Sequence, residues 1–203
     1  MSRFTGPRVK AMRAVGVDLP GLSRKSIERR PYPPGQHGQA RRKISEFGRR
    51  LREKQKLRLN YGLRELQMRR LMDEASRGQG NAGARLIELL ERRLDNVFFR
   101  AGFARTIAAA RHVVGHGHVL VNGRHVDVPS YRVRQGDVIT LRERSRGLES
   151  VAEALAHPGG PPPAWLEVDG AARTVRVASL PDETSVPFPV DVKLVVEFYS
   201  RSL

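Results

Sequence analysis

Apolar residues recur with the period of an α-helix between positions 86 and 101. The stripe repeats every three or four residues and consists of Leu86, Leu89, Leu90, Leu94, Val97, Phe98 and Ala101. Such spacing is typical of a helix that buries one face in a core. We expect this helix to be capped by Asn81 and to be interrupted near Asp95.

Two further helices precede this stripe. Residues 46–60 predict a helix with Ser45 as its N-cap, because a Ser side chain accepts a hydrogen bond from the free backbone N–H groups at a helix start. Residues 64–77 predict a second helix, and the glycines just after residue 77 are expected to end it. Within the first helix, three cations at i, i+3 and i+7 share one face: Arg49, Arg52 and Lys56.

The centre of the chain changes from helical to strand periodicity. Thr106 is a good cap for a helix over residues 107–115, and two β-branched runs then flank Asn122 and Gly123. An Asn-Gly pair between such runs is the strongest short signal for a β-hairpin, because a type I′ turn needs positive φ at both positions. With a further strand over 138–142, the sequence predicts helices packed on a small hairpin-based sheet, and the fold class is α+β.

Both ends of the chain are less regular. Residues 1–44 contain several Pro and Gly residues and little apolar periodicity, which predicts an irregular basic arm that orders on a partner. At the other end, residues 149–156 predict a short helix. Strands are expected over three later segments, which are 165–168, 174–178 and 192–198.

Charge separates these regions further. The formal net charge is +16, and residues 1–80 hold 21 Lys and Arg against 7 Asp and Glu. Residues 148–203 carry 4 basic and 8 acidic residues, so the balance is reversed there. A surplus of cations favours a polyanionic partner, because it opposes compaction of the free chain by self-repulsion. Of the basic residues 31 are Arg, whose planar guanidinium matches phosphate oxygens and guanine edges.

Cysteine is absent from the sequence, which excludes disulfides, thiolate catalysis and cysteine-ligated zinc. The first ten residues lack the apolar segment of a secretory signal, and no stretch approaches the roughly 18 apolar residues that a membrane span requires. We therefore expect a cytoplasmic protein whose partner is nucleic acid rather than a membrane.

Several motifs resemble those of the small-subunit ribosomal protein S-four family, over nearly the whole chain. The run from Gly102 to Asp127, with HGHVLVNG near its end, is similar to the RNA-binding module that carries the family's name. Five further motifs resemble the ribosomal protein itself, and they are ERRPYPPGQHG at 28–38, LREKQKL at 51–57, RLDNV at 93–97, PSYRV at 129–133 and EFYSR at 197–201. Many members hold a zinc ion with four cysteines in the first ~45 residues, so this chain resembles the zinc-free branch.

This resemblance implies a structural constituent of the small ribosomal subunit that binds ribosomal RNA (rRNA) directly. The family binds a multi-helix junction in the 5′ domain of small-subunit rRNA, nucleates assembly of the subunit body and influences translational accuracy. Its protein neighbours are small-subunit ribosomal proteins five and twelve. The resemblance implies no catalytic activity, cofactor, bound metal or small-molecule substrate.

The implied organisation has four parts. They are a basic extended arm at 1–44, a helical subdomain at 45–91, the S-four-type module at 92–155 and, at 156–203, C-terminal strands that complete the helical subdomain. One departure from the family concerns the start of the helix at 107, where the module usually has Ser or Thr followed by Arg. Here Thr106 is followed by Ile107, so an RNA contact from this point stays open, with Arg105 as the substitute.

RNA contacts are expected from cations, hydrogen-bonding groups and aromatic rings in three regions. In the arm they are Arg3, Arg8, Lys10, Arg30, Tyr32, Gln36, His37, Arg41, Arg42 and Lys43. In the helical subdomain they are Arg49, Arg50, Arg52, Lys54, Lys56, Arg58 and Arg69. In the module they are Arg105, Arg111, His112, His116, Asn122, Arg124, Tyr131, Arg132 and Arg134. Cations neutralise phosphates and release counterions, whereas aromatic rings stack on unpaired bases.

Three alternatives compete with this interpretation. His112 and His116 have the i, i+4 spacing of metal ligands on a helix, but no carboxylate completes a convincing set. The run Arg-Leu-Asp at 93–95 resembles part of the catalytic motif of RNA pseudouridine synthases, yet no Gly precedes it and too little chain follows the module for their catalytic domain. A stand-alone RNA chaperone or stalled-ribosome factor with the same module would lack the long basic N-terminal region.

Overall fold

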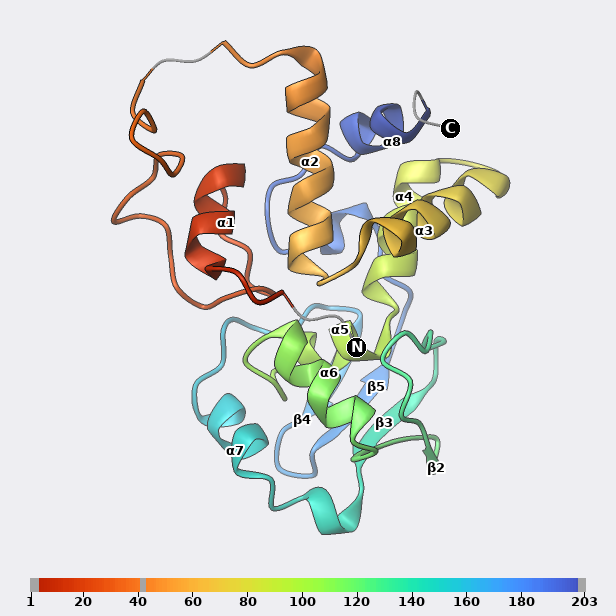
Figure 1. Ribbon diagram of the computed structural model, residues 1–203. Coiled ribbons are helices and arrows are strands. Elements are labelled where there is room, and N and C mark those ends of the chain that lie inside the picture. The colour runs from red at the N-terminus through yellow and green to blue at the C-terminus, as the bar shows by residue number, and fades with distance from the viewer. Residues whose placement is uncertain (1–3, 41–42, 201–203) are drawn as a thin grey trace. The chain divides into compact units, whose positions relative to one another are not determined.

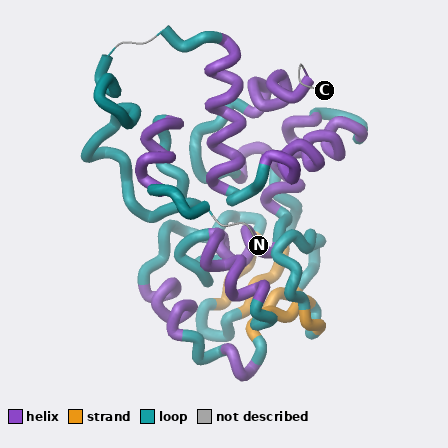
Figure 2. Tube along the Cα trace, viewed as in Figure 1, coloured by secondary structure: helices purple, strands orange, loops and turns teal. Residues whose placement is uncertain are grey.

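The computed structural model describes residues 4–40 and 43–200 (Figure 1). The chain forms two compact units, one from Met1–Leu86 together with Val186–Leu203 and one from Ile87–Ser185. The first unit is helical, and the strands of the described residues all lie in the second unit, as the orange segments of Figure 2 show. The predicted α+β fold class is confirmed.

The helices of the first unit pack around buried apolar side chains. They are α1 (Arg8–Val15), α2 (Glu46–Asn60), α3 (Glu65–Arg77), the first half of α4 (Ala82–Glu91) and α8 (Val192–Ser200). α2 contacts both α1 and α8, and α3 also contacts α8. The predicted cap of α2 is confirmed, because Ser45 Oγ accepts a hydrogen bond from Gly48 N at 3.1 Å. Asn81 caps α4 in the same way, with Oδ1 2.8 Å from Gly83 N.

The arm is not irregular throughout, because residues 8–15 form α1. Met12 and Leu19 are fully buried, and Val15 and Leu22 are nearly so. Met12 and Val15 are three positions apart in α1, which places them on one face of the helix, and Leu19 and Leu22 lie in the turns that follow it. The neighbouring Pro and Gly residues hide this short period in the sequence, and α2 supplies the apolar surface that the segment lacks by itself.

The strand expected over residues 192–198 is wrong, since this segment forms α8. Its valines favour a strand, but Val195 and Tyr199 are four residues apart and both are buried, which is a helical period. α8 packs on α2 and α3. Burial of one helical face therefore outweighs the strand preference of the β-branched residues.

The second unit arranges helices and a five-stranded sheet around one apolar core. α5 (Leu94–Arg100) and α6 (Ile107–Gly115) pack on each other, and their apolar side chains share one cluster with those of the strands. The strands are β1 (Val119–Val121), β2 (Arg124–His125), β3 (Val138–Leu141), β4 (Leu166–Asp169) and β5 (Thr174–Val177). They pair antiparallel in the order β2-β1-β3-β5-β4. The unit also contains η1 (Glu143–Ser145), α7 (Glu149–Ala156) and η2 (Glu183–Ser185).

Strands β4 and β5 do not complete the helical subdomain, contrary to the expectation from the sequence. β5 pairs with β3, and Val175 lies opposite Ile139 in that pair. Both side chains are fully buried, so the two C-terminal strands extend the hairpin sheet. Local alternation indicates where a strand lies, but its partner depends on residues far away in the chain.

The predicted hairpin and the helix before it are confirmed. Asn122 has φ of 50° and Gly123 has φ of 76°, as a type I′ turn requires. Asn122 is also tied to β3, because its side chain donates to Asp137 Oδ1 at 2.8 Å and accepts from Val138 N at 2.9 Å. α6 has the predicted bounds, and the Thr106 side chain accepts the capping hydrogen bond.

The apolar stripe of residues 86–101 is divided between α4 and α5, so the predicted interruption is confirmed. The break includes Arg93, whose backbone is extended with ψ of 135°. The N–H of Leu94 donates to the carbonyl of Tyr131 at 2.8 Å. The loop between β2 and β3 thus satisfies a backbone group that the break leaves without a helical partner.

Candidate nucleic-acid interface

Most of the arm residues that are predicted to contact RNA are exposed to solvent. The exposed members are Arg8, Lys10, Arg30, Gln36, His37 and Lys43. The predicted residues Arg3, Arg41 and Arg42 lie outside the described residues. Exposed cations bind phosphates without first giving up buried contacts, so this part of the arm is suited to a polyanion.

Tyr32, the tyrosine predicted to contact RNA from the arm, already has a partner within the unit. The guanidinium carbon of Arg13 lies 4.9 Å from the ring centroid, which is a cation–π contact. Arg13 Nε also donates to the carbonyl groups of Arg30 and Tyr32, both at 3.0 Å. One arginine of α1 thus holds the proline-rich segment in place. The role of Arg13 was not predictable from the sequence, because these partners are 17 and 19 residues further along the chain.

The cationic face expected on α2 is only partly present. Arg49 has 62% of its side chain accessible, and Arg52 is half-buried. Lys56 has the helical spacing of this face, but it is not accessible there, since only 8% of the residue is exposed. Its ammonium donates to Glu53 at 2.7 Å and to the carbonyl of Pro189 at 3.2 Å. Moving Lys56 to a phosphate would leave the Glu53 carboxylate without its partner, so this burial opposes the RNA contact predicted for Lys56, which stays a prediction.

Lys54 is also buried, in a polar cluster of the first unit. Its ammonium lies 2.8 Å from Glu65 Oε2 and 4.6 Å from the ring centroid of Phe198. Tyr199 donates to the other oxygen of Glu65 at 2.9 Å. Partial burial raises the pKa of the Glu65 carboxyl, but hydrogen bonds from Lys54 and Tyr199 outweigh it, so this pKa lies below its ordinary value. Burial and the hydrogen bond to Glu65 raise the pKa of Tyr199.

The other predicted cations of the helical subdomain differ in how accessible they are. Arg50 is anchored to Glu197 of α8 through a 2.8 Å hydrogen bond, and 12% of its side chain is accessible. Arg58 is half-buried, whereas Arg69 is exposed on α3. Positive residues that look equivalent in the sequence are therefore divided between the interior of the unit and its surface.

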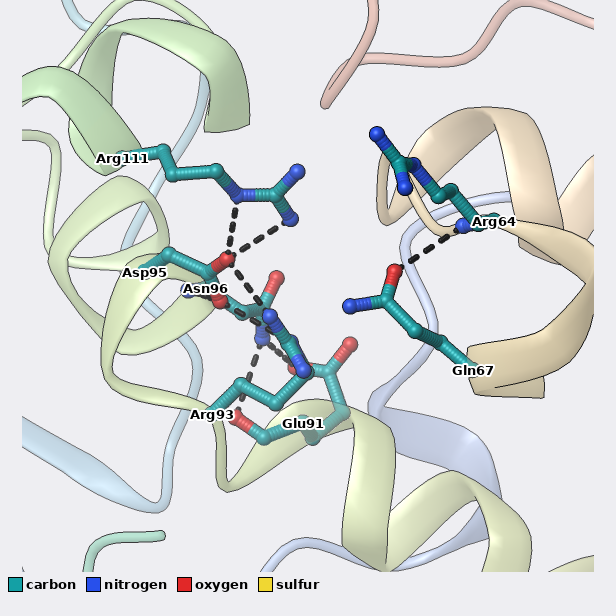
Figure 3. A network of polar contacts seen from close by, with 7 residues as sticks. All are labelled: Arg64, Gln67, Glu91, Arg93, Asp95, Asn96 and Arg111. Atoms are coloured by element: carbon teal, nitrogen blue, oxygen red, sulfur yellow. Dashed lines mark hydrogen bonds and ion pairs between the residues drawn. The ribbon is translucent and has the colours of Figure 1, made fainter. Parts of the chain in front are cut away.

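A buried carboxylate organises the arginines near the break between α4 and α5. Asp95 is fully buried, and Figure 3 shows two guanidinium groups directed at it. Arg93 donates from Nε at 3.1 Å and from Nη2 at 2.9 Å, while Arg111 donates from the same two atoms at 2.8 and 2.7 Å. The N–H of Asn96 adds a hydrogen bond at 2.9 Å. Because these donors enclose the carboxylate, Asp95 positions arginines and is not available to a substrate.

Glu91 forms a second buried ion pair in the same region. It is fully buried, accepts a hydrogen bond from Asn96 Nδ2 at 2.9 Å and lies 3.4 Å from Arg100 Nε. Asn96 therefore contacts both buried carboxylates. Figure 3 also draws the start of α3 in the first unit, where Arg64 N donates to Gln67 Oε1 at 3.0 Å.

Histidines form a row at the end of α6 and just before β1. His112 and His116 are exposed, and their ring centroids are 5.8 Å apart. The ring of His118 is 6.3 Å from that of His116, and its Nδ1 lies 2.8 Å from Ser145 Oγ. In the described part of the chain, no group of three or more His, Asp or Glu residues is placed to hold a metal ion. The row is suited to donating hydrogen bonds to an anion.

Three predicted cations of the module are exposed, and they are Arg105, Arg124 and Arg134. Arg105 pairs with Glu153 of α7 at 2.6 Å, and their side chains are 43% and 52% accessible. A surface pair of this kind contributes about 0–1 kcal/mol. A phosphate can therefore replace Glu153 as the partner of Arg105.

Three other predicted residues of the module are committed to the fold. Both polar ends of the Asn122 amide bond the start of β3, as described above. Tyr131 is partly buried against the apolar core. Arg132 is half-buried, and its backbone forms an antiparallel bridge with Arg93. These three residues therefore stabilise the fold beneath the surface and offer fewer free groups to RNA than the exposed cations do.

The predicted cations that are exposed to solvent lie on both units. In the first unit they include Arg8, Lys10, Arg30, Lys43 and Arg49, and in the second Arg105, Arg124 and Arg134. Surfaces of this kind attract phosphate groups and release their counterions. Among the residues that the structure describes, no helix is both long enough and apolar enough to cross a membrane.

Comparison with known proteins agrees with these features. Residues 3–91 match the family described as "Ribosomal protein S4/S9 N-terminal domain", and residues 92–139 match the S4 domain. The chain is 58% identical over 205 residues to small ribosomal subunit protein uS4 of Methylobacillus flagellatus, and all of each chain is covered. It is 53% identical to protein uS4B of Nitrosomonas europaea, again over all of both chains, and 52% identical to uS4 of Synechocystis, with 99% of each covered. Identity at this level over the full length confirms what the motifs predicted, and the chain belongs to the ribosomal protein uS4 family.

Proposed function

We propose that this protein is a structural constituent of the small ribosomal subunit and binds the rRNA of that subunit directly. The observation that carries the proposal is the set of exposed cations on two separate units of a uS4-family chain. The relatives are named small ribosomal subunit proteins, and their family is not an enzyme family. The proposal includes a cytoplasmic location and no cofactor or small-molecule substrate.

Affinity in this mechanism comes mainly from phosphate neutralisation. Each phosphate contact adds roughly 0.7–0.9 to the slope of log affinity against log salt, because condensed counterions are released. Specificity comes from the shape of a folded RNA, since the deep major groove of an A-form helix is closed to side chains. Arg111 is anchored by buried Asp95, and 14% of its side chain is accessible, so it contributes less to this affinity than the exposed arginines do.

The proposed RNA site is a multi-helix junction in the 5′ domain of small-subunit rRNA. Two basic units on one chain support this choice, because each can bind a different RNA helix and the second contact then forms at high effective concentration. Binding that joins helices in this way would nucleate assembly of the subunit body. A contribution to translational accuracy is part of the same proposal.

Small-subunit ribosomal proteins five and twelve are the proposed protein neighbours. An apolar surface of the first unit supports a protein contact, since Phe47 and Leu66 are 61% and 59% exposed. The rings of Phe47 and Phe198 are 5.7 Å apart. A hollow of about 380 Å³ beside them is lined in part by Leu66, Phe198 and Tyr199. Large apolar side chains exposed together are typical of protein interfaces.

Footprinting combined with a salt titration tests the proposal. The full chain is bound to small-subunit rRNA and to the same RNA with the junction disrupted. We expect protection of the folded junction, loss of that protection in the disrupted RNA, and affinity that falls steeply with salt. A correctly folded chain that protects no junction would overturn the proposal.

Paired substitutions show which surface makes the contacts. R8Q/K10Q in the arm and R124Q/R134Q in the module each remove two exposed cations. Each should lower the salt slope by about 1.4–1.8, at roughly 0.7–0.9 per phosphate. The control R173Q/R176Q removes the same charge from the acidic C-terminal part of the second unit and should leave the slope unchanged.

A further inference from the structure

Three exposed arginines follow β3 and have no role in the interface described so far. Arg142, Arg144 and Arg146 alternate along the turn between β3 and α7, and all three are exposed. Across the described residues, none of them forms an ion pair. They lie beyond residues 92–139, which match the S4 domain. Their charges are therefore available to a partner.

The turn that carries these arginines is fixed to the sheet. Ser145 is 5% exposed, and its N–H donates to the carbonyl of Arg142 at 2.8 Å. Its Oγ lies 2.8 Å from Nδ1 of His118. The N–H of Arg142 donates to the carbonyl of His118 at 2.9 Å, which continues the ladder between β1 and β3. Ser145 thus fills the inner side of the turn while the arginines on either side of it reach solvent.

The same turn is continuous with the histidine row at the end of α6. His118 joins the two, because it contacts Ser145 and its ring is 6.3 Å from that of exposed His116. Between positions 142 and 146 the sequence contains one acid, Glu143, which is exposed. Residues 142–146 therefore combine three guanidinium groups with one carboxylate and connect through Ser145 to the histidine row.

We propose that Arg142, Arg144 and Arg146, together with His116 and His118, form a further binding surface for the phosphates of RNA. This inference rests on the proposed function and adds a second place on the module where the same rRNA is held. Guanidinium groups bind phosphate oxygens with two parallel hydrogen bonds, and an imidazole N–H donates to them as well. Because the turn is already ordered by Ser145, binding costs little backbone entropy.

Equal losses of charge within the second unit test this surface. R142Q/R144Q and R173Q/R176Q each remove two positive charges from the full chain, and 63% of the Arg176 side chain is accessible. The salt slope of binding to small-subunit rRNA is measured for both. R142Q/R144Q should lower the slope by about 1.4–1.8, at roughly 0.7–0.9 per phosphate, and the control should not change it. R142K/R144K keeps the charge and should keep most of the slope.

Glu143 offers a change of the opposite sign. E143Q removes the carboxylate from the turn, so affinity at fixed salt should rise if phosphates lie there. The control is E167Q, which neutralises an acid on β4 whose side chain is 63% accessible, and it should leave the affinity unchanged. Circular dichroism establishes that each variant is folded, and E143Q decides the question even where the double variant folds poorly.

The outcomes separate this inference from the function on which it rests. If the wild type binds the junction and R124Q/R134Q lowers the slope, equal slopes for R142Q/R144Q and R173Q/R176Q overturn the further surface alone. An E143Q affinity no higher than that of E167Q also overturns it. If the wild type binds no folded rRNA, the proposed function fails and this surface fails with it.

Discussion

Replacing Asp95 by Asn removes a negative charge from the interior of the second unit and keeps the size of the side chain. Asp95 is fully buried, Arg93 is 7% exposed, and 14% of the Arg111 side chain is accessible. The new amide places an NH2 group where the carboxylate accepted hydrogen bonds, and both guanidinium groups lose their counter-charge. Breaking a buried pair by removing one partner costs about 3–5 kcal/mol, so we expect D95N to destabilise the unit by that order.

Urea unfolding of the full chain, followed by circular dichroism, measures this loss. With a slope of roughly 2–3 kcal/mol per molar urea, the midpoint should fall by about 1–2.5 M. The matched control is E167Q, which also converts an acid to its amide. Glu167 pairs with Arg176 at 3.9 Å, and both side chains are 63% accessible, so E167Q should cost less than about 1 kcal/mol.

A double variant tests whether the loss comes from charges that have lost their partner. In D95N/R111Q one of the two cations leaves together with the acid. The loss should therefore be smaller than the sum of the single losses by about 0.5–3 kcal/mol, as for residues in one network. A D95N loss below about 1 kcal/mol, or strict additivity in the double variant, would refute the reasoning.

Three further changes test other parts of the structure. The pKa of Glu65 is lowered in the folded protein, so its contribution to stability is present above the ordinary value of 4.5 and is lost as the pH falls through the folded pKa. E65Q should therefore make the urea midpoint less dependent on pH in this acidic range, and an unchanged dependence would contradict the role of the Lys54 contact. N122A removes two side-chain hydrogen bonds at a residue with φ of 50°, and it should destabilise the second unit by about 1–3 kcal/mol in urea unfolding. G117A places a side chain at φ of 75° and should lower the thermal midpoint through backbone strain, although exposed His125, whose Nε2 would lie 2.5 Å from the new Cβ, can move aside. G147A, with nothing within 4 Å of its Cβ, should not lower it, and equal midpoints would show that this backbone is not strained.

Signals between neighbouring residues made much of this fold predictable from the sequence. Ser45 and Thr106 cap their helices because a cap needs only an N–H group three residues away. Asn122 and Gly123 specify their turn through their own backbone preferences. The expected helix over residues 149–156 coincides with α7. These elements are specified by residues that lie close together in the sequence.

Elements that depend on distant partners were not predictable in this way. α1 and α8 both pack on α2, which supplies the apolar surface that their short sequences need. The pairing of β5 with β3 joins residues more than thirty positions apart, such as Ile139 and Val175. Local propensity is a weak guide in such segments, because tertiary burial outweighs it.

The same limit applies to the interface, where cations that look alike in the sequence have different partners in the structure. Lys56 bonds the carbonyl of Pro189, 133 residues away, and Arg50 bonds Glu197, 147 residues away. A cation that already has a buried or anchored partner must lose it before it binds a phosphate, which offsets the gain. The net charge of +16 therefore overstates the number of phosphates that the protein holds. The salt slope should follow the accessible cations without an internal partner, so R50Q should lower it less than R124Q does.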